Sequence, residues 1–168
     1  MRGEYFYRSV IYLCEHNKEG SLGFVINKPT GLLLNDIFPH LKNAHFPIFE
    51  GGPVSTNQLF YTHTLGSQLV DSIRVTEDVY WGGNFMALSS MIEKHQIQAH
   101  QIRFYIGYSG WSAEQLEDEI LNDSWFHHAG NYKQLITQLP DNVWGQEMIK
   151  ISPSNKVFAD YSFFPSLN

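Results

Sequence analysis

The first half of the chain consists of short runs of β-branched and aromatic residues, separated by glycine, proline and asparagine. Such runs are typical of buried β-strands. The first two runs, 8–14 and 22–27, enclose Asn17 and Gly20, which favour a turn. We therefore expect a β-hairpin whose connecting loop includes residues 14–17. Four further strands are expected at 46–54, 58–64, 72–75 and 101–108.

Helical periodicity is more common in the second half of the chain. The segment 84–95 carries Phe85, Leu88 and Ile92 at helical spacing, and Asn84 is a suitable N-cap. Early hairpins followed by crossovers predict an α+β fold with a mixed sheet, and the absence of repeats and linkers predicts a single domain. Other helices are expected between Pro29 and Pro39 and at 112–121, 131–139 and 142–151.

Composition limits the classes of function. Hydrophobic residues make up 43% of the 168 residues, and no apolar run reaches the roughly 20 residues that span a bilayer. The net charge of −6, without a basic cluster, argues against direct binding of nucleic acid. The single cysteine, Cys14, excludes an intramolecular disulfide and fits a reducing compartment. We expect a cytoplasmic protein that binds neither membrane nor nucleic acid.

The stretch FYIGYSGWSAEQLEDEI has the strand–turn–helix layout of a hydrolase nucleophile elbow. That motif has glycines two positions before and two positions after the serine. Gly107 fits the first position, but Gly110 follows Ser109 directly. A serine nucleophile also needs a histidine base and an acid, which no spacing here identifies. Because Ser112 and Gln115 explain the same layout as a helix capping box, we predict no catalytic serine.

Cys14 and His16 are the other candidates for chemistry. A histidinium beside a thiol lowers the thiol pKa and makes the sulfur nucleophilic. Alternatively, Cys14 ends an apolar strand and belongs to the core, where free cysteine is common. The sequence leaves both interpretations open. The eight histidines show no zinc-binding spacing, and neither the Walker nor the Rossmann glycine pattern occurs, so we expect no metal and no cofactor.

Four stretches together resemble the AlgH/YqgE family of small bacterial proteins: RSVIYLCEHNKEGSLGFVINKP, EGGPV, VYWGGNF, and RFYIGYSGWSAEQLEDEI followed by Trp125. The similarity extends over nearly the whole chain. It implies a single compact α+β domain over residues 1–168, with a mixed, partly barrel-like β-sheet surrounded by helices. It also implies a bacterial cytosolic protein without a known cofactor or demonstrated catalysis. Some members carry the label of transcriptional regulator, but the acidic chain lacks a helix-turn-helix pattern for direct DNA binding.

The resemblance also implies a set of candidate surface positions. Glycine and proline at these positions have ordinary turn explanations as well. Members usually carry one more N-terminal strand before YFYRSV, so we expect an exposed sheet edge that a partner or a second copy could fill. Carried over residue by residue, the candidate binding surface comprises Cys14, Glu15, His16, Asn17, Asn27, Lys28, Pro29, Gly51, Gly52, Pro53, Tyr108, Ser109, Gly110 and Trp111.

Three hypotheses for function follow. The first is a non-enzymatic binding or regulatory protein with a cleft for a small molecule or protein partner, near the 14–17 loop and the 108–111 turn. The alternative is a thiol-dependent enzyme or redox sensor that uses Cys14. A third is a structural interaction partner that assembles, with itself or another chain, through a sheet edge.

Overall fold

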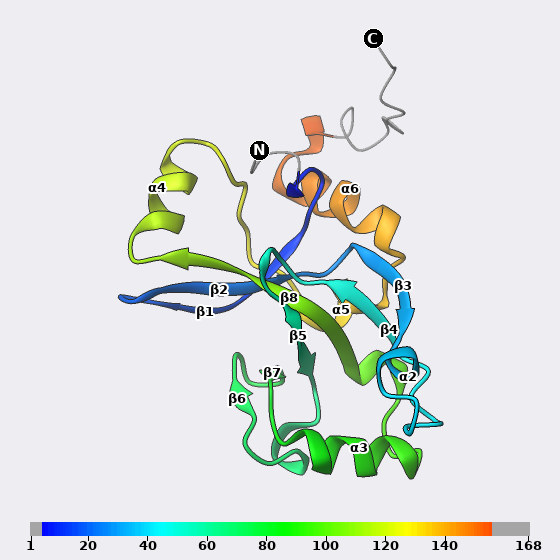
Figure 1. Cartoon of the computed structure of the whole chain (residues 1–168). Helices are drawn as coiled ribbons and strands as arrows, with labels where there is room; N and C mark the ends of the chain where they lie inside the picture. The colour runs from blue at the N-terminus through cyan, green and yellow to red at the C-terminus, as the bar shows by residue number, and fades with distance from the viewer. Residues whose placement is uncertain (1–4, 156–168) are drawn as a thin grey trace.

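The computed structural model describes residues 5–155, which form one mixed β-sheet with short helices around it (Figure 1). The strands are β1 (Ile11–Asn17), β2 (Gly20–Val25), β3 (Pro29–Leu33), β4 (Pro47–Glu50), β5 (Val54–His63), β6 (Ile73–Arg74), β7 (Tyr80–Trp81) and β8 (Ile102–Ser112). The helices are α2 (Leu34–Ile37), α3 (Phe85–Glu93), α4 (Gln115–Leu121), α5 (Tyr132–Thr137) and α6 (Pro140–Ile151). The predicted α+β fold is confirmed.

Strand β8 organises the sheet because it pairs with three other strands. Antiparallel β5 pairs with residues 102–108 of β8. Parallel β4 pairs with residues 104–106, and antiparallel β2 pairs with residues 109–112. The resulting strand order is β1-β2-β8-β5-β7-β6, with β3 joined through β4. The partner of β8 changes at Gly107, and the sheet curls there into an open half-barrel (Figure 1).

Glycines allow two backbones to cross closely at this change of partner. Gly51 and Gly52 follow β4 and lie against β8. A Cβ atom on Gly52 would lie 2.1 Å from the carbonyl carbon of Tyr108, and one on Gly51 would lie 2.2 Å from the oxygen of Gly107. Real Cβ atoms do not approach other atoms this closely. The EGGPV and GYSG stretches therefore meet as a backbone crossing that excludes side chains.

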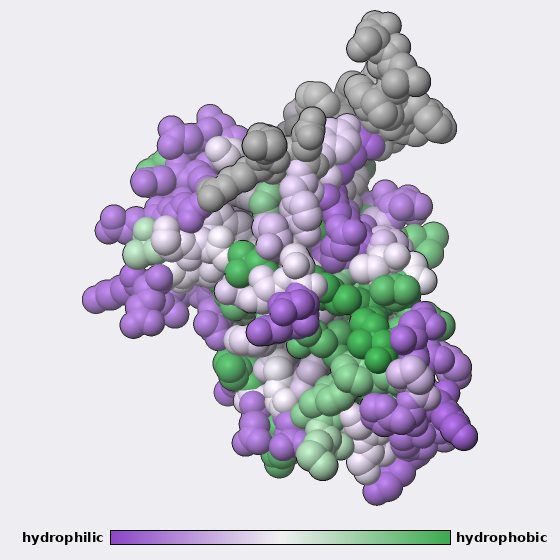
Figure 2. Space-filling model, in the orientation of Figure 1, coloured by the Kyte–Doolittle hydropathy of each residue, from purple (hydrophilic) through white to green (hydrophobic). Residues whose placement is uncertain are grey.

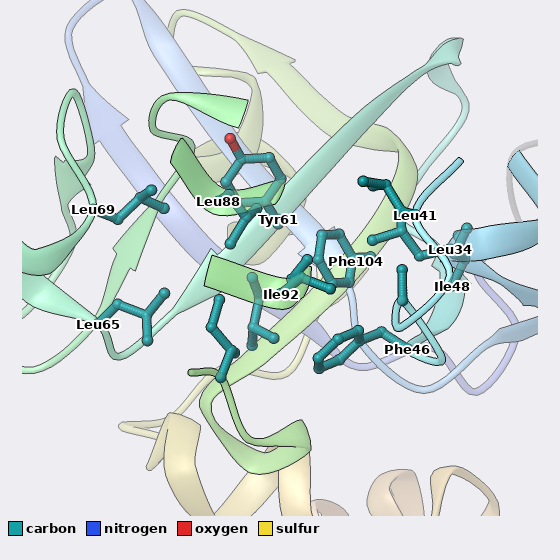
Figure 3. Packing of buried hydrophobic residues seen from close by; sticks show 13 residues of the cluster. Leu34, Leu41, Phe46, Ile48, Tyr61, Leu65, Leu69, Leu88, Ile92 and Phe104 are labelled. Atoms are coloured by element: carbon teal, nitrogen blue, oxygen red, sulfur yellow. The ribbon is translucent and has the colours of Figure 1, made fainter. Parts of the chain in front are cut away.

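The pleat of β8 directs alternate side chains into two cores. Phe104 is fully buried in a cluster that includes Leu88 of α3, and Figure 3 shows it among the residues of that cluster. Tyr105 belongs to a second cluster with Leu135 of α5 and Val143 of α6. Successive strand residues face opposite sides of a sheet. The helices α3 and α5–α6 thus cover opposite faces of the same strand.

A buried arginine fastens α5 to the sheet. The guanidinium of Arg103 donates to the Ile26 oxygen at 2.5 Å and to the Ile136 oxygen at 2.7 Å, and it lies 4.2 Å from the centre of the Phe49 ring. Ile136 lies in the last turn of α5, where carbonyl groups lack helical partners and a cation is favourable. Burial lowers the pKa of Arg103.

Strand β3 has a protected edge. Pro29 has no N–H group, and the N–H groups of Leu32 and Leu33 donate to Thr30 Oγ1 and Asp36 Oδ2 at 3.1 Å and 2.8 Å. Donors satisfied in this way cannot pair with an added strand. The seven-residue β1 and the two-residue β6 end the main path of the sheet. Pairing of a partner or a second copy with a sheet edge stays a prediction.

Apolar side chains reach the surface beside β3 and α2. Leu32, Ile37 and Met86 are exposed, and Figure 2 shows apolar residues gathered across the centre of this face. The neighbouring rings of Phe38 and Phe85 pack with centroids 5.0 Å apart. This surface is the outer side of the core beneath α2 and α3.

Within residues 5–155 no helix combines the length and apolar character that a bilayer crossing needs.

Three local predictions need correction. β1 pairs with β2 as far as Asn17, so the predicted 14–17 loop is strand and the turn consists of Lys18 and Glu19. Likewise, residues 108–111 pair with β2 or β5 and belong to β8 instead of a turn. Glycines in a strand accommodate a close crossing as well as a turn, and here they do the former. Between Pro29 and Pro39 the chain begins as β3, and only Leu34–Ile37 is helical.

Helix starts follow the predicted capping chemistry in part. Asn84 caps α3, since its Oδ1 accepts from the Ala87 N–H at 3.0 Å. Gln115 Oε1 accepts from the Ser112 N–H at 3.0 Å, which is one half of the predicted capping box. However, α4 begins at Gln115, after Glu114 with a φ of 63°. The serine is therefore not the N-cap residue.

We predict that Gly107→Ala destabilises the fold strongly. The φ of Gly107 is +70°, and a Cβ would lie 2.4 Å from the Gly52 oxygen. The left-handed backbone costs roughly 1–2 kcal/mol for alanine, and the collision adds to it, for a total of about 3 kcal/mol or more. Gly31→Ala is the matched control, because its φ is +83° with no atom within 4 Å of the new Cβ. If urea unfolding shows that both variants lose the same free energy of unfolding, close packing at Gly107 is contradicted.

His63 is fully buried and is held as a neutral imidazole. The Leu65 N–H donates to its Nδ1 at 3.2 Å, so the proton resides on Nε2, which lies 3.0 Å from the Gly82 oxygen. The imidazole stacks on the Tyr80 ring with an interplanar angle of 10°. Desolvation lowers the pKa of His63 below its ordinary value of 6.5.

We predict that His63 makes the protein acid-sensitive. Below about pH 6.5 the unfolded chain takes up a proton that the folded His63 does not, so stability is complete above that pH and is lost as the pH falls toward the folded pKa. Urea unfolding at about pH 7.5 and about pH 5 should show a smaller loss in His63→Gln than in the parent. Equal losses in the two proteins would remove His63 as the cause.

Candidate functional site

Side chains close the half-barrel between β1 and the β6–β7 hairpin. Trp81 Nε1 donates to Glu15 Oε1 at 3.2 Å, and Tyr12 packs with Val75 against a small core that includes Tyr132 of α5. We term this region the seam; it comprises Tyr12, Cys14, Glu15, residues 75–81 and Tyr132. A bulge in β1 lies between Leu13, which pairs with Gly23, and Glu15, which pairs with Leu22, so that Cys14 is the extra residue. Such a bulge redirects side chains, and here it brings Glu15 to Trp81.

A pocket of about 300 Å³ opens at the seam. This volume lies at the lower end of the range for small-molecule sites. The lining comes from β1, from the loop between β6 and β7, and from the segment that starts α5. Its residues are Tyr12, Thr76, Glu77, Asp78, Val79, Gly130, Asn131, Tyr132 and Lys133.

Two tyrosines form the aromatic side of the pocket. The rings of Tyr12 and Tyr132 lie 5.0 Å apart at an angle of 54°. The Tyr132 hydroxyl lies 2.5 Å from Thr62 Oγ1, which lies 3.0 Å from the Tyr105 hydroxyl, so this buried network fixes the Tyr132 ring. Desolvation, with the nearby Cys14, raises the pKa of Tyr12 to about 12. The Tyr12 phenol therefore stays protonated and can donate a hydrogen bond.

Three charged groups line the pocket. Lys133 Nζ and Asp78 Oδ2 form an ion pair at 2.9 Å, and both side chains are more than half exposed, at 57% and 64%. Glu77 makes no ion pair with any residue in the described part of the chain. The formal charge of the lining is therefore −1. Asn131 caps α5, since its Oδ1 accepts from the Gln134 N–H at 3.2 Å.

Cys14 lies in the core beside the pocket. Its Sγ lies 3.8 Å from the Tyr12 oxygen, and burial, together with the Glu15 carboxylate, raises the thiol pKa. The imidazole of His16 has other partners: Nδ1 lies 2.8 Å from Ser21 Oγ and Nε2 lies 3.7 Å from Glu117 Oε1. These contacts support the interpretation of Cys14 as a core residue. Asn17 ends β1, and its Oδ1 accepts from the Glu19 N–H in the hairpin turn.

Ser109 has a structural partner. Its hydroxyl donates to the Gly51 oxygen at 3.1 Å, and the residue is 1% exposed. Buried in this way, it stabilises the crossing of β8 with the glycines that follow β4. Gly110, by contrast, is exposed on β8, as is Pro53 before β5.

Asn27 and Lys28 bind the segment that precedes β1. Asn27 Oδ1 accepts from the Val10 N–H at 2.8 Å, and its Nδ2 donates to the Arg8 oxygen at 2.9 Å. Lys28 Nζ donates to the Tyr5 oxygen and lies 5.1 Å from the centre of the Tyr5 ring. Pro29 follows as the first residue of β3. This part of the candidate surface thus holds the chain terminus in place.

Trp111 connects β8 to α4. One carboxylate oxygen, Glu119 Oε2, accepts from Trp111 Nε1 at 2.9 Å and from Trp125 Nε1 at 2.8 Å. The two indole rings lie 5.9 Å apart. The shared acceptor fixes the segment after α4 against the sheet, which explains the joint occurrence of the two tryptophans.

The structure thus divides the predicted surface among five places. Only Cys14 and Glu15 lie at the seam, and Asn17 lies at the β1–β2 turn. The remaining candidates lie at the glycine crossing, at the N-terminal attachment and at the contacts of α4. No sequence signal marks the pocket, because its three segments share no motif and are separated by 50 residues or more in each case. Within residues 5–155, no group of three acidic, histidine or cysteine side chains is placed to hold a metal ion.

Comparison with known proteins identifies the family. A family model described as AlgH-like matches residues 1–155. The chain belongs to the AlgH-like family. A UPF0301 protein of Cytophaga hutchinsonii is 34% identical over 164 residues, which is 97% of this chain and 90% of that protein. A UPF0301 protein of Chlorobium limicola is 31% identical over 163 residues, which is 97% of this chain and 87% of that protein.

Two solved structures share the AlgH-like fold. The solution structure of AlgH from Pseudomonas aeruginosa has a TM-score of 0.75 at 24% identity, covering 98% of this chain and 89% of that one. A crystal structure of a Corynebacterium diphtheriae protein has a TM-score of 0.73 at 19% identity, covering 93% of this chain and 84% of that one. These similarities establish the fold, and the predicted family is confirmed.

We predict that iodoacetamide modifies folded Cys14 far more slowly than it modifies the unfolded chain at neutral pH. Burial excludes the reagent and the raised thiol pKa keeps the thiolate scarce. The rate should be measured by mass spectrometry in buffer and in urea, with Cys14→Ser as the control for reaction at other residues. A folded rate equal to the unfolded rate would instead support a thiol enzyme or redox sensor.

Proposed function

We propose that this AlgH-like protein is a non-enzymatic binding protein that holds a small molecule in the seam pocket. The observation that carries the proposal is the position of the pocket at the side-chain closure of the half-barrel. Three distant segments converge there, and one of them, β1, also carries the predicted candidates Cys14 and Glu15, which do not themselves line the pocket. Binding sites are commonly placed where separate elements meet.

The surroundings of the pocket favour a preformed site. The buried Thr62 holds the Tyr132 hydroxyl, and Arg103 fixes the end of α5. A wall that is fixed before binding loses little entropy when a ligand arrives. The loop with Thr76 is more exposed and provides the open side.

The lining chemistry favours binding over covalent catalysis. Tyr12 and Thr76 offer hydroxyl groups, and the carboxylates and Lys133 offer charge-assisted contacts. The two nucleophiles considered from the sequence, Ser109 and Cys14, are buried and do not line the pocket. The single cysteine supports a cytoplasmic location. The net charge of −6 favours a ligand-dependent regulatory role over direct binding to DNA.

The test is a two-dimensional amide NMR screen with a panel of amines, alcohols and carboxylates of fragment size. We expect at least one class to shift the amides of Thr76, Val79 and Tyr132 in a saturable manner. Thr76→Trp should abolish the shifts, because the indole fills the pocket from its rim. Thr56→Trp, at an exposed position of β5, is the matched control and should leave binding unchanged. A panel that leaves these amides unperturbed would overturn the proposed function.

A further inference from the structure

We infer that the seam pocket takes a small organic monocation, a primary or quaternary amine. This inference rests on the proposed function, since it names the ligand class of the same pocket. It depends on three features of the lining: its net charge, its paired aromatic rings and the loosely held lysine at its rim.

The charge of the lining selects a single positive charge. Glu77 and Asp78 provide two carboxylates, and Lys133 neutralises one of them. One carboxylate equivalent thus remains within the pocket, and Glu77 has no ion-pair partner among the described residues. The net charge of −6 on the whole chain also raises the local concentration of cations and disfavours anions.

The aromatic side suits an ammonium group. The half-buried Tyr12 ring lines the pocket, and it packs at 54° against the buried Tyr132 ring, which supports it from behind. Cations bind to the faces of such rings through the ring quadrupole, and quaternary ammonium ions do so best because their methyl groups carry the charge and need little hydration. A pocket of about 300 Å³ accommodates an ammonium group with a short chain.

Lys133 competes with a bound cation for the Asp78 carboxylate. Its ion pair with Asp78 is 2.9 Å long, yet both side chains are more than half exposed. Exposed pairs of this kind contribute little free energy, so an incoming ammonium ion can displace the lysine at small cost. Removal of Lys133 should therefore strengthen cation binding, an effect opposite in sign to that of removing a carboxylate.

The experiment is an amide NMR titration of the full chain with three probes of nearly equal shape. Choline carries the positive charge, 3,3-dimethyl-1-butanol is its neutral isostere, and 3,3-dimethylbutanoate is an anion. We expect saturable shifts at Glu77, Val79 and Tyr132 with choline, and affinities at least about fivefold weaker for the other two. The difference should decrease as the ionic strength rises.

Charge variants provide the second test. Glu77→Gln should weaken choline binding about fivefold, and Lys133→Gln should strengthen it about threefold. Glu114→Gln before α4 and Lys94→Gln after α3 are matched controls at exposed sites outside the pocket and should leave the dissociation constant unchanged. Unfolding curves of all four variants establish that each is folded.

The outcomes separate the two proposals. If the neutral or anionic probe binds at the pocket as well as choline, or if Lys133→Gln weakens binding, the monocation inference is overturned while the pocket remains a binding site. The monocation inference is likewise overturned if choline does not bind and an alcohol or a carboxylate fragment occupies the pocket. If no probe and no fragment perturbs the pocket amides, both the inference and the proposed function fail.

Discussion

The close approach of two backbones at Gly107 is the constraint on which the rest of the structure depends. β8 pairs first with β4 and then with β2. This change of partner requires that the backbone of Gly51 and Gly52 pack directly against the backbone of β8 around Gly107. A side chain at any of these three positions would separate the strands. The Gly51 N–H donates to the Ile106 oxygen and the Gly51 oxygen accepts from the Val25 N–H, so the crossing is also hydrogen-bonded.

The curl of the sheet has consequences at its margins. Because β2 and β4 diverge, β1 lies close to the β6–β7 hairpin at the other end of the sheet. The two ends of the sheet contact each other through side chains such as Glu15 and Trp81. A seam joined by side chains leaves space where a backbone ladder would leave none. The pocket at the seam is therefore a product of incomplete barrel closure, and α5 provides its remaining wall.

Much of the fold could be predicted from the sequence because the signals involved are local. The helix that begins after Asn84 carries its own cap and apolar spacing, and the runs that became β1, β2 and β5 are unmistakably strand-like. Glycine was the ambiguous signal. Around 108–111 it predicts a turn, because close crossing and chain reversal require the same residue, and only the partner strand distinguishes them.

The candidate site was harder to predict for a different physical reason. The family motifs are rich in residues that hold the backbone together, such as Ser109 on Gly51 and Glu119 between two indoles, whereas the charged residues of the pocket lie at the surface and belong to no motif. Glu77 and Lys133 acquire significance only when folding brings the 76–79 loop against the start of α5. Motifs in this chain therefore identify the scaffold, and they leave the residues that line the pocket unmarked. Substitutions at the seam leave the glycine crossing intact, so the pocket lining can change without loss of the fold.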